Sequence, residues 1–109
     1  MIKFVELFNF LPGDREDYQS WARGINEGLL TQPELRRITV YENALFATPQ
    51  RVVELEFDDL ASMERYLERP EVKQIYLEWG GKCTSQQSMV LRFVSSQSGV
   101  TDAARDIAE

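Results

Sequence analysis

The chain has 109 residues, 43% of them hydrophobic and 28% charged, as is typical of one globular domain with a single core. The formal net charge is −6 and the longest basic run is Arg36-Arg37, so we expect no nucleic-acid partner. The chain has no histidine and one cysteine, which removes the commonest metal ligand and general base and excludes an internal disulfide. We therefore expect no metal and no other cofactor.

The first residues already have the alternation of a strand, with an acid at Glu6, so they do not resemble a signal peptide. No apolar run approaches the length that spans a bilayer. These features predict a cytoplasmic protein with no membrane partner.

Residues 2–10 are rich in Phe, Val and Ile and predict a strand that is at least partly buried on both faces. Pro12-Gly13 then breaks the chain, and Asp14 is suited to cap a helix over 14–30. The apolar face of that helix repeats at helical spacing and consists of Tyr18, Trp21, Ala22, Ile25 and Leu29.

Residues 35–42 and 51–58 alternate with a period of two and predict two strands joined by a hairpin loop. Asp58-Asp59 precede a second helix, which Arg69-Pro70 interrupts because the residue before a proline avoids the helical region. The apolar stripe resumes after Pro70 with Val72, Ile75, Tyr76 and Trp79, and Gly80-Gly81 ends it.

A last strand is expected at about residues 86–94. The order β-α-β-β-α-β predicts a ferredoxin-like α+β domain at residues 1–95, with two helices on one face of a four-stranded antiparallel sheet. Residues 96–109 form a polar C-terminal tail with a short apolar stripe at Val100, Ala104 and Ile107.

Alternation divides the strand residues into two faces. The almost wholly apolar set is assigned to the helices: Val5, Leu7, Asn9, Ile38, Val40, Val53, Leu55, Phe57, Met89, Leu91 and Phe93. The other set mixes aromatic and charged residues: Phe4, Glu6, Phe8, Phe10, Arg37, Thr39, Tyr41, Val52, Glu54, Glu56, Val90, Arg92 and Val94. A face with so many aromatic residues is rarely left to water.

The chain has no further element to cover that second face, so we expect a second copy to cover it in a homodimer. The expected dimer face contains Phe4, Glu6, Phe8, Arg37, Tyr41, Glu54 and Arg92. Arg37 is expected near Glu54 or Glu56, and Arg92 near Glu6. These charges either fix the register of the dimer or form solvated pairs worth at most about 1 kcal/mol each.

This element order, with a second helix broken in the run Leu67-Glu68-Arg69-Pro70-Glu71-Val72, resembles the dimeric α/β-barrel superfamily over residues 1–94. Members include antibiotic-biosynthesis monooxygenase-like, EthD-like, NIPSNAP-like and stress-responsive proteins. The resemblance implies two sheets that face each other across a dimer, and a pocket between sheet and helices in each subunit.

The resemblance also implies site residues. Monooxygenase-like members oxidise aromatic polyketides without a metal, and the haem-degrading branch uses an Asn on the first strand, a Trp and a helical His. Asn9 and Trp79 are the corresponding residue types here, and no His is present to complete the haem set. The same absence counts against isomerase-like and EthD-like activities that depend on His.

Aromatic residues with a polar tip are numerous for so short a chain, and they suit a pocket for an apolar ligand with one polar end. The expected ligand-binding residues are Asn9, Tyr18, Trp21, Tyr66, Tyr76 and Trp79. At helical spacing the same aromatic residues are more often plain core. Asn9 either orients a ligand or caps the end of its strand.

Two other chemistries are weaker. Glu6, Glu54 and Glu56 can act as an acid–base set only if they are buried together, and ion pairing with nearby arginines is the favoured alternative. Cys83 follows Lys82 but lacks a His partner for a nucleophile.

Three functions stay open at this point. The first is a protein that binds a small apolar or amphipathic ligand, such as an acyl or polyketide-like acid, in the helix–sheet pocket. The second is a cofactor-independent monooxygenase or isomerase in which Asn9, a Tyr and a Trp position the substrate. The third is a structural dimer with a filled core.

Overall fold

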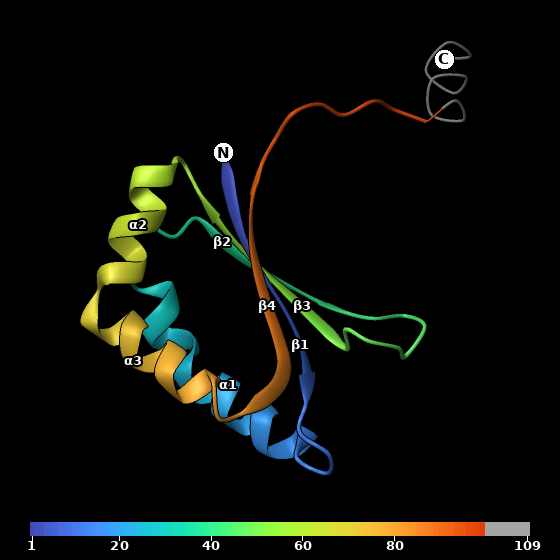
Figure 1. Ribbon diagram of the computed structural model, residues 1–109. Coiled ribbons are helices and arrows are strands. Elements are labelled where there is room, and N and C mark those ends of the chain that lie inside the picture. Colours follow the sequence, from blue (N-terminus) through green and yellow to red (C-terminus); the bar gives the residue numbers. More distant parts are fainter. Residues whose placement is uncertain (100–109) are drawn as a thin grey trace.

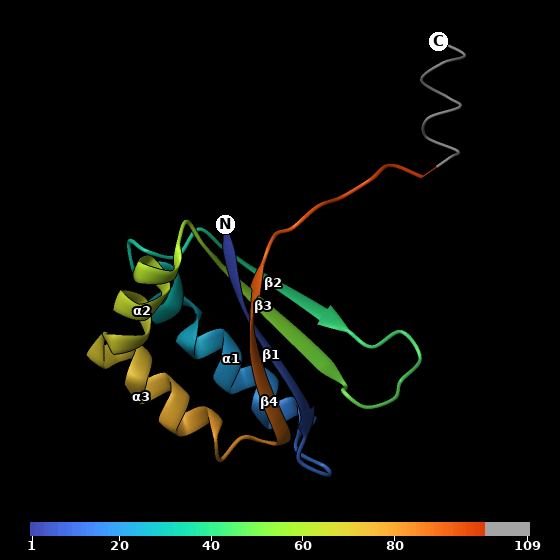
Figure 2. The ribbon, with the colours of Figure 1, turned by 45° about the horizontal axis from the view of Figure 1, so that its top comes forward.

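The computed structural model describes residues 1–99 and has the predicted ferredoxin-like α+β fold. One antiparallel sheet has the strand order β2-β3-β1-β4, and the helices lie on one of its faces (Figures 1 and 2). The elements are β1 (Ile2–Phe10), α1 (Arg15–Leu30), β2 (Arg37–Glu42), β3 (Arg51–Phe57), α2 (Leu60–Glu68), α3 (Pro70–Trp79) and β4 (Cys83–Arg92).

The boundaries follow local chemistry. Asp59 caps α2, because its carboxylate accepts a hydrogen bond from the backbone N–H of Ser62 at 2.8 Å. Asp14 precedes α1 without a side-chain cap, and only its backbone carbonyl accepts a bond, from the N–H of Tyr18. β4 begins at Cys83, three residues before the predicted start.

The predicted break in the second helix is real and separates α2 from α3. Arg69 has an extended backbone (φ −66°, ψ 134°), and Pro70 is the first residue of α3. The guanidinium of Arg69 donates two hydrogen bonds of 2.6 and 2.8 Å to the carboxylate of Glu34, which lies between α1 and β2. The break is thereby fastened to the loop that leads into the sheet.

The predicted face assignment is right for two strands and wrong for two. Residues directly opposite each other in an antiparallel pair share a face, and Phe4 lies opposite Leu55, as Glu6 lies opposite Val53. Since Leu55 and Val53 pack beneath the helices as predicted, Phe4 and Glu6 lie there too. Phe8 and Phe10 also belong to the helix side, where they pack against Tyr18.

Because the faces of β1 and β4 are exchanged relative to the prediction, the residues of these strands that were assigned to the helices lie on the face without helices. Val5 lies opposite Met89, and Lys3 lies opposite Leu91, so these side chains share the face without helices. The physical reason is that β1 is apolar on both faces, so alternation alone does not say which set is inside. Phe4, Glu6 and Phe8 are therefore not part of the face proposed for dimer contact.

Two hydrophobic clusters fill the layer between sheet and helices. The α2-side cluster comprises Ile2, Leu35, Leu55, Phe57, Met63, Tyr66 and Val72. The aromatic cluster comprises Phe8, Phe10, Tyr18 and Cys83, with Trp21 and Trp79 packed against it. Phe8 and Phe57 are both fully buried, which makes each cluster a closed core in its own right.

The sheet face that carries no helix, called here the open face, has ion pairs of its own. Lys3 Nζ lies 3.6 Å from a carboxylate oxygen of Glu54, and Arg37 Nε lies 3.5 Å from one of Glu56. The predicted proximity of Arg37 to these acids is therefore correct. Arg92 is not near Glu6, because it lies opposite Ile2 at the far end of β1.

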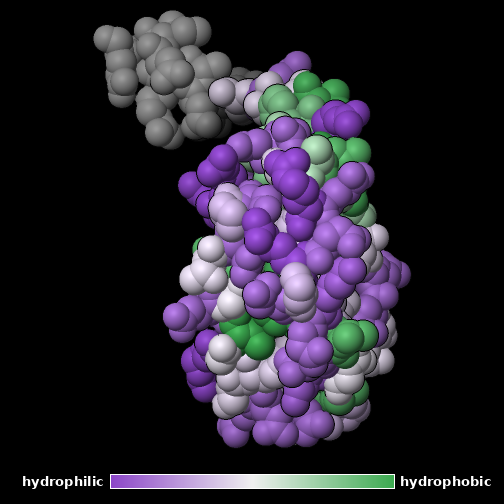
Figure 3. Space-filling model, turned by 90° about the vertical axis from the view of Figure 1, so that its left-hand side faces the viewer, coloured by the Kyte–Doolittle hydropathy of each residue, from purple (hydrophilic) through white to green (hydrophobic). Residues whose placement is uncertain are grey.

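The outer surface of the helix side is mostly hydrophilic, with apolar residues scattered in small patches (Figure 3). Within residues 1–99 no helix is long and apolar enough to cross a membrane. The predicted stripe at Val100, Ala104 and Ile107 lies outside the described residues.

Candidate functional site

A cavity of about 50 Å³ lies between the sheet and the α1–α3 helix pair. Counted out to open solvent, the free space there is about 380 Å³. The lining residues come from β1, β2, β3, α1 and α3 and are mostly aliphatic or aromatic: Glu6, Tyr18, Trp21, Ile25, Leu29, Ile38, Val53, Leu55, Ile75, Tyr76 and Trp79. The cavity therefore has an apolar wall with one carboxyl group in it.

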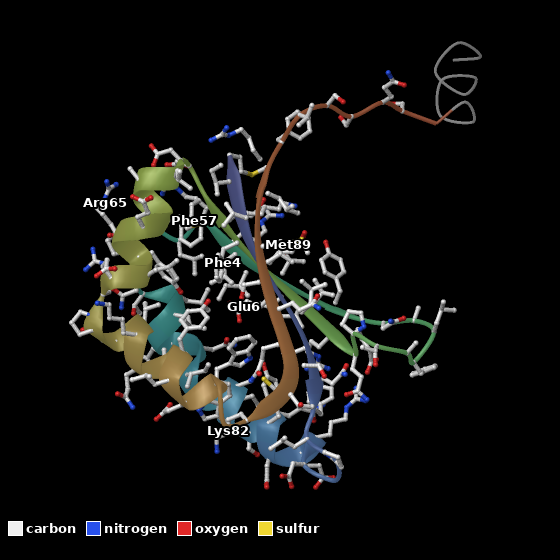
Figure 4. The ribbon with its side chains drawn as sticks, in the orientation of Figure 1. Phe4, Glu6, Phe57, Arg65, Lys82 and Met89 are labelled. Atoms are coloured by element: carbon white, nitrogen blue, oxygen red, sulfur yellow. The ribbon has the colours of Figure 1, made fainter. Side chains whose placement is uncertain are left out.

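Glu6 is that carboxyl group, and it projects from the middle of β1 into the helix–sheet layer (Figure 4). Only 6% of the residue is exposed. The phenolic O–H of Tyr76, on α3, donates a hydrogen bond to Glu6 Oε1. None of the six ion pairs within residues 1–99 includes Glu6, so its charge has no basic partner there.

Burial raises the pKa of Glu6 from its ordinary value of 4.5 to about 7, and the hydrogen bond from Tyr76 works in the opposite direction. The ionisable neighbours are Tyr76 on α3, Tyr18 on α1, Tyr66 on α2 and Cys83 at the start of β4. Burial also raises the pKa of each of these groups, so all four are neutral at pH 7. Glu6 is thus the group near the cavity that changes charge close to neutrality.

Four of the six expected ligand-binding residues line the cavity: Tyr18, Trp21, Tyr76 and Trp79. Nε1 of Trp79 is buried, has no hydrogen-bond acceptor in good geometry within the described part of the chain, and has Tyr18 as a polar neighbour. The indole N–H of Trp21 donates a 3.1 Å bond to Glu78, which joins α1 to α3 beside the cavity.

The other two expected residues lie elsewhere. Tyr66 is fully buried in the α2-side cluster, where its ring packs 5.0 Å from that of Phe57. Asn9 lies at the end of β1, where its side-chain oxygen accepts a 2.9 Å bond from the N–H of Gln50 and its amide donates to Thr48. Asn9 therefore fastens the β2–β3 loop to β1.

Cys83 also takes a structural place. It is buried in the aromatic cluster, its thiol donates to the carbonyl of Trp79, and burial raises its pKa to about 11. A thiol in that state is a poor nucleophile near neutral pH. Among residues 1–99, no group of three or more His, Cys, Asp or Glu side chains is placed to hold a metal ion.

Sequence reasoning grouped Glu6 with the open-face acids and so missed its place in the cavity. The available signal was an isolated acid within the apolar run IKFVELFNF, flanked on both sides by residues of high strand propensity. An acid in such a run either faces solvent or is one of the few acids buried in a protein interior. Only the strand register distinguishes the two cases.

A second, more open groove of about 440 Å³ lies close by, because Tyr76 lines both spaces. Its lining residues are Phe4, Leu67, Lys73, Tyr76 and Leu77. This groove contains no buried acid, so the two spaces differ in chemistry although they share a side chain.

Solved structures match the whole architecture at low sequence identity. A dabb-family protein with a ferredoxin-like fold from Mesorhizobium loti superposes with a TM-score of 0.75 at 11% identity, and the match covers 86% of this chain and 97% of that one. The chain shares the ferredoxin-like fold of that protein. This fold is the one that the order of elements in the sequence predicted.

Two further solved structures extend the comparison. The cofactor-independent oxygenase SnoaB from Streptomyces nogalater matches with a TM-score of 0.72 at 18% identity, over 89% of this chain and 94% of that one. A dimeric protein of ferredoxin-like fold from Bacteroides fragilis matches with a TM-score of 0.65 at 20% identity, over 84% and 95%. No protein-family model and no curated protein matches the sequence.

Proposed function

We propose that this barrel protein binds a small, largely apolar molecule with one neutral hydrogen-bonding group, in the cavity beneath α1 and α3. The observation that supports it is the buried Glu6 carboxyl in an otherwise apolar and aromatic wall. Burying a carboxyl group without a cation costs stability, and an aliphatic residue would fill the same place without that cost. Contact with a ligand would explain why a carboxyl group occupies this buried position.

The polar groups of the cavity define the polar end of the ligand. Glu6 can accept a hydrogen bond when ionised and donate one when protonated, and the indole N–H of Trp79 needs an acceptor. A hydroxyl or carbonyl group meets both needs. A carboxylate placed at Glu6 would face a like charge, so in an acyl or polyketide-like acid the acid group points away from Glu6.

The cavity must widen to take such a ligand. Pockets that hold a drug-sized molecule usually measure about 300–1,000 Å³, well above the 50 Å³ enclosed here. Ile25 and Ile75 are partly exposed, line the cavity and belong to neither buried cluster, so their side chains can move outward without disturbing those clusters. Outward movement of these two side chains would enlarge the cavity.

The test uses β-naphthol, an apolar bicycle with one hydroxyl, and follows protein fluorescence. Both tryptophans of the chain line the cavity, so binding should change their emission in a saturable way. Ile75→Phe should abolish the response by filling the cavity, whereas Leu77→Phe, two residues along α3 and 75% exposed, should leave it intact. A response lost only in Leu77→Phe would place the ligand in the second groove and contradict the proposal.

We also propose that two copies pair through their open faces. Tyr41, Met89 and Leu91 are each between 41% and 51% exposed on that face, and an apolar sheet surface of this kind is usually covered. Glu54 adds a second reason, since its Oε2 is buried with no hydrogen-bond partner within residues 1–99. Basic and acidic side chains on the same face give a second copy complementary partners.

Sedimentation equilibrium tests the dimer. Leu91→Glu should yield monomers, because it places a charge in the covered face, while Leu77→Glu on the helix side should stay dimeric. An unchanged dimer in Leu91→Glu would rule out the open face as the interface. Phe8→Glu, which the sequence alone favours for this test, is unsuitable because Phe8 is fully buried and its replacement unfolds the subunit.

The oxygenase alternative relied on Asn9 to position the substrate. Asn9, its proposed positioning group, is bonded to Gln50 at the end of β1 and does not line the cavity. Acid–base chemistry is the enzymatic alternative that a specific observation favours, and that observation is again Glu6.

A further inference from the structure

We infer that Glu6 is a general base that moves a proton between two carbon atoms of the bound molecule, so that the protein acts as an isomerase on an apolar, unsaturated ketone. This inference rests on the proposed binding function, and it names the substrate class and the reacting group of that same cavity. It depends on three observations: where the carboxyl group lies, what surrounds it, and which other groups are absent.

The first observation is position. Glu6 lies on β1, a central strand of the sheet, and its side chain lines the cavity below α1 and α3. The hydrogen bond from Tyr76 holds one carboxyl oxygen, Oε1, from the α3 side. The second oxygen, Oε2, forms no hydrogen bond within residues 1–99 that would compete with a ligand for it.

The second observation is the surroundings. A carboxylate removes a proton from carbon more readily when water and cations do not stabilise its charge. No cation pairs with Glu6 in the described part of the chain, and its pKa of about 7 leaves both protonation states accessible near neutral pH. By contrast Glu54, on the neighbouring strand but on the open face, lies 3.6 Å from Lys3.

The third observation is the lack of a competing base among the lining residues. Tyr18 and Tyr76 are the other ionisable lining groups, and burial raises the pKa of each, so both stay protonated. Trp21 and Trp79 carry only N–H donors. Proton abstraction within the cavity therefore falls to Glu6.

The reaction is balanced without a co-reactant. In a β,γ-unsaturated ketone, the Glu6 carboxylate takes a proton from the carbon between the carbonyl group and the C=C bond. The C–H bond breaks, and its electron pair delocalises over the C=C bond and onto the carbonyl oxygen. The protonated Glu6 then returns the proton to a different carbon of the same conjugated anion, which moves a double bond and regenerates the carboxylate. The N–H of Trp79, which has no acceptor in good geometry within residues 1–99, is a suitable donor for the oxygen on which charge develops.

Nitrobenzisoxazole is a suitable probe, because loss of its ring proton breaks the N–O bond and releases a coloured nitrophenolate. We expect saturable turnover that rises with pH through a midpoint near 7, as the raised pKa of Glu6 requires. Glu6→Gln should lower turnover by roughly 100-fold or more, the usual loss when a positioned base is removed. Glu64→Gln, which changes an exposed acid on α2, is the control and should leave turnover unchanged.

The variant Tyr76→Phe tests whether Glu6 acts as the base or has only a structural role. It removes the hydrogen bond that lowers the pKa of Glu6, so the midpoint of the pH profile should move upward. An unmoved midpoint would show that some other group is the base. A carbon NMR titration of the Glu6 carboxyl in the wild-type protein checks the assignment directly and does not depend on any variant folding.

Nitroindole, which has a similar shape but no N–O bond, measures binding separately by fluorescence. If it binds and the wild-type protein turns over nitrobenzisoxazole no faster than free acetate does, the base is refuted while the binding function survives. If neither nitroindole nor β-naphthol binds, the proposed function fails and this inference fails with it. A Glu6 carboxyl that titrates near 4.5 would overturn the inference whatever binds.

Discussion

The α2-side cluster and the cavity region differ in how completely side chains fill the helix–sheet layer. In the cluster, Phe57, Tyr66 and Val72 are fully buried and belong to one continuous group of packed side chains. In the cavity region, Ile25 and Ile75 are partly exposed, and Glu6 is the acid in the wall. The α2 end of the helix–sheet layer is thus filled by packed side chains, whereas the middle of the layer contains a cavity with one carboxyl group.

The largest test of this difference is a pair of truncations. Phe57→Ala removes a fully buried ring from the α2-side cluster and should lower the free energy of unfolding by about 4 kcal/mol. Ile75→Ala enlarges a cavity that already exists, at a partly exposed position, and should cost only about 2 kcal/mol. Urea unfolding at one fixed protein concentration measures both, and equal losses would mean that the two regions are packed alike.

The second test uses pH. The pKa of Glu6 is higher in the folded protein than the ordinary 4.5, so the folded state holds its proton longer than the unfolded state. The free energy of unfolding should therefore fall as pH rises from 4.5 to 7, by about 3 kcal/mol in all, and should level off above pH 7.

No histidine titrates between pH 4.5 and 7, because the chain has none. The acids whose pKa is lowered by arginine partners or backbone bonds, such as Glu34 and Asp59, titrate below it. Glu6→Gln should accordingly flatten the curve between pH 4.5 and 7 and make the protein more stable than wild type above pH 7. A slope that persists in Glu6→Gln would assign it to another group.

The smallest test adds one methylene group to each region. Val53→Ile extends into the cavity and should raise the free energy of unfolding by about 1 kcal/mol. Val72→Ile adds the same group to a fully buried position in the α2-side cluster and should lower it by about 1–2 kcal/mol. Thermal unfolding at fixed concentration should give shifts of opposite sign, and shifts of the same sign would remove the distinction.

Local features of the sequence predicted the fold well. Proline after Arg69 determines where the second helix breaks, and Asp59 caps α2, because both effects act within a few residues. Strand alternation also placed Leu55 and Phe57 correctly, since β3 has acids on one side and apolar residues on the other. Chemistry within one element was sufficient for these predictions.

The position of the candidate site depends on how β1 pairs with its neighbouring strands. The alternation of residues within one strand does not determine that pairing. β1 is apolar on both faces, so its register against β3 decides whether Glu6 lies in the cavity or on the open face. The pairing of β1 with β4 also shifts between Leu7 and Asn9, an irregularity that the sequence does not mark. Tyr18, Tyr76 and Trp79 were placed near one another because helical spacing points them at the sheet whatever its register.

The two ends of α3 are held very differently, and this constrains how any molecule enters. At its start, the double hydrogen bond from Arg69 to Glu34 and the buried Val72 fix the helix to the loop and the core. Towards its end, a single side-chain bond from Trp21 to Glu78 joins it to α1. Tyr76 and Trp79 also hold this end against the sheet, through the hydrogen bond to Glu6 and through packing against the aromatic cluster. A molecule that enters beside the Trp21–Glu78 bond therefore meets side chains that line the cavity before it reaches Glu6.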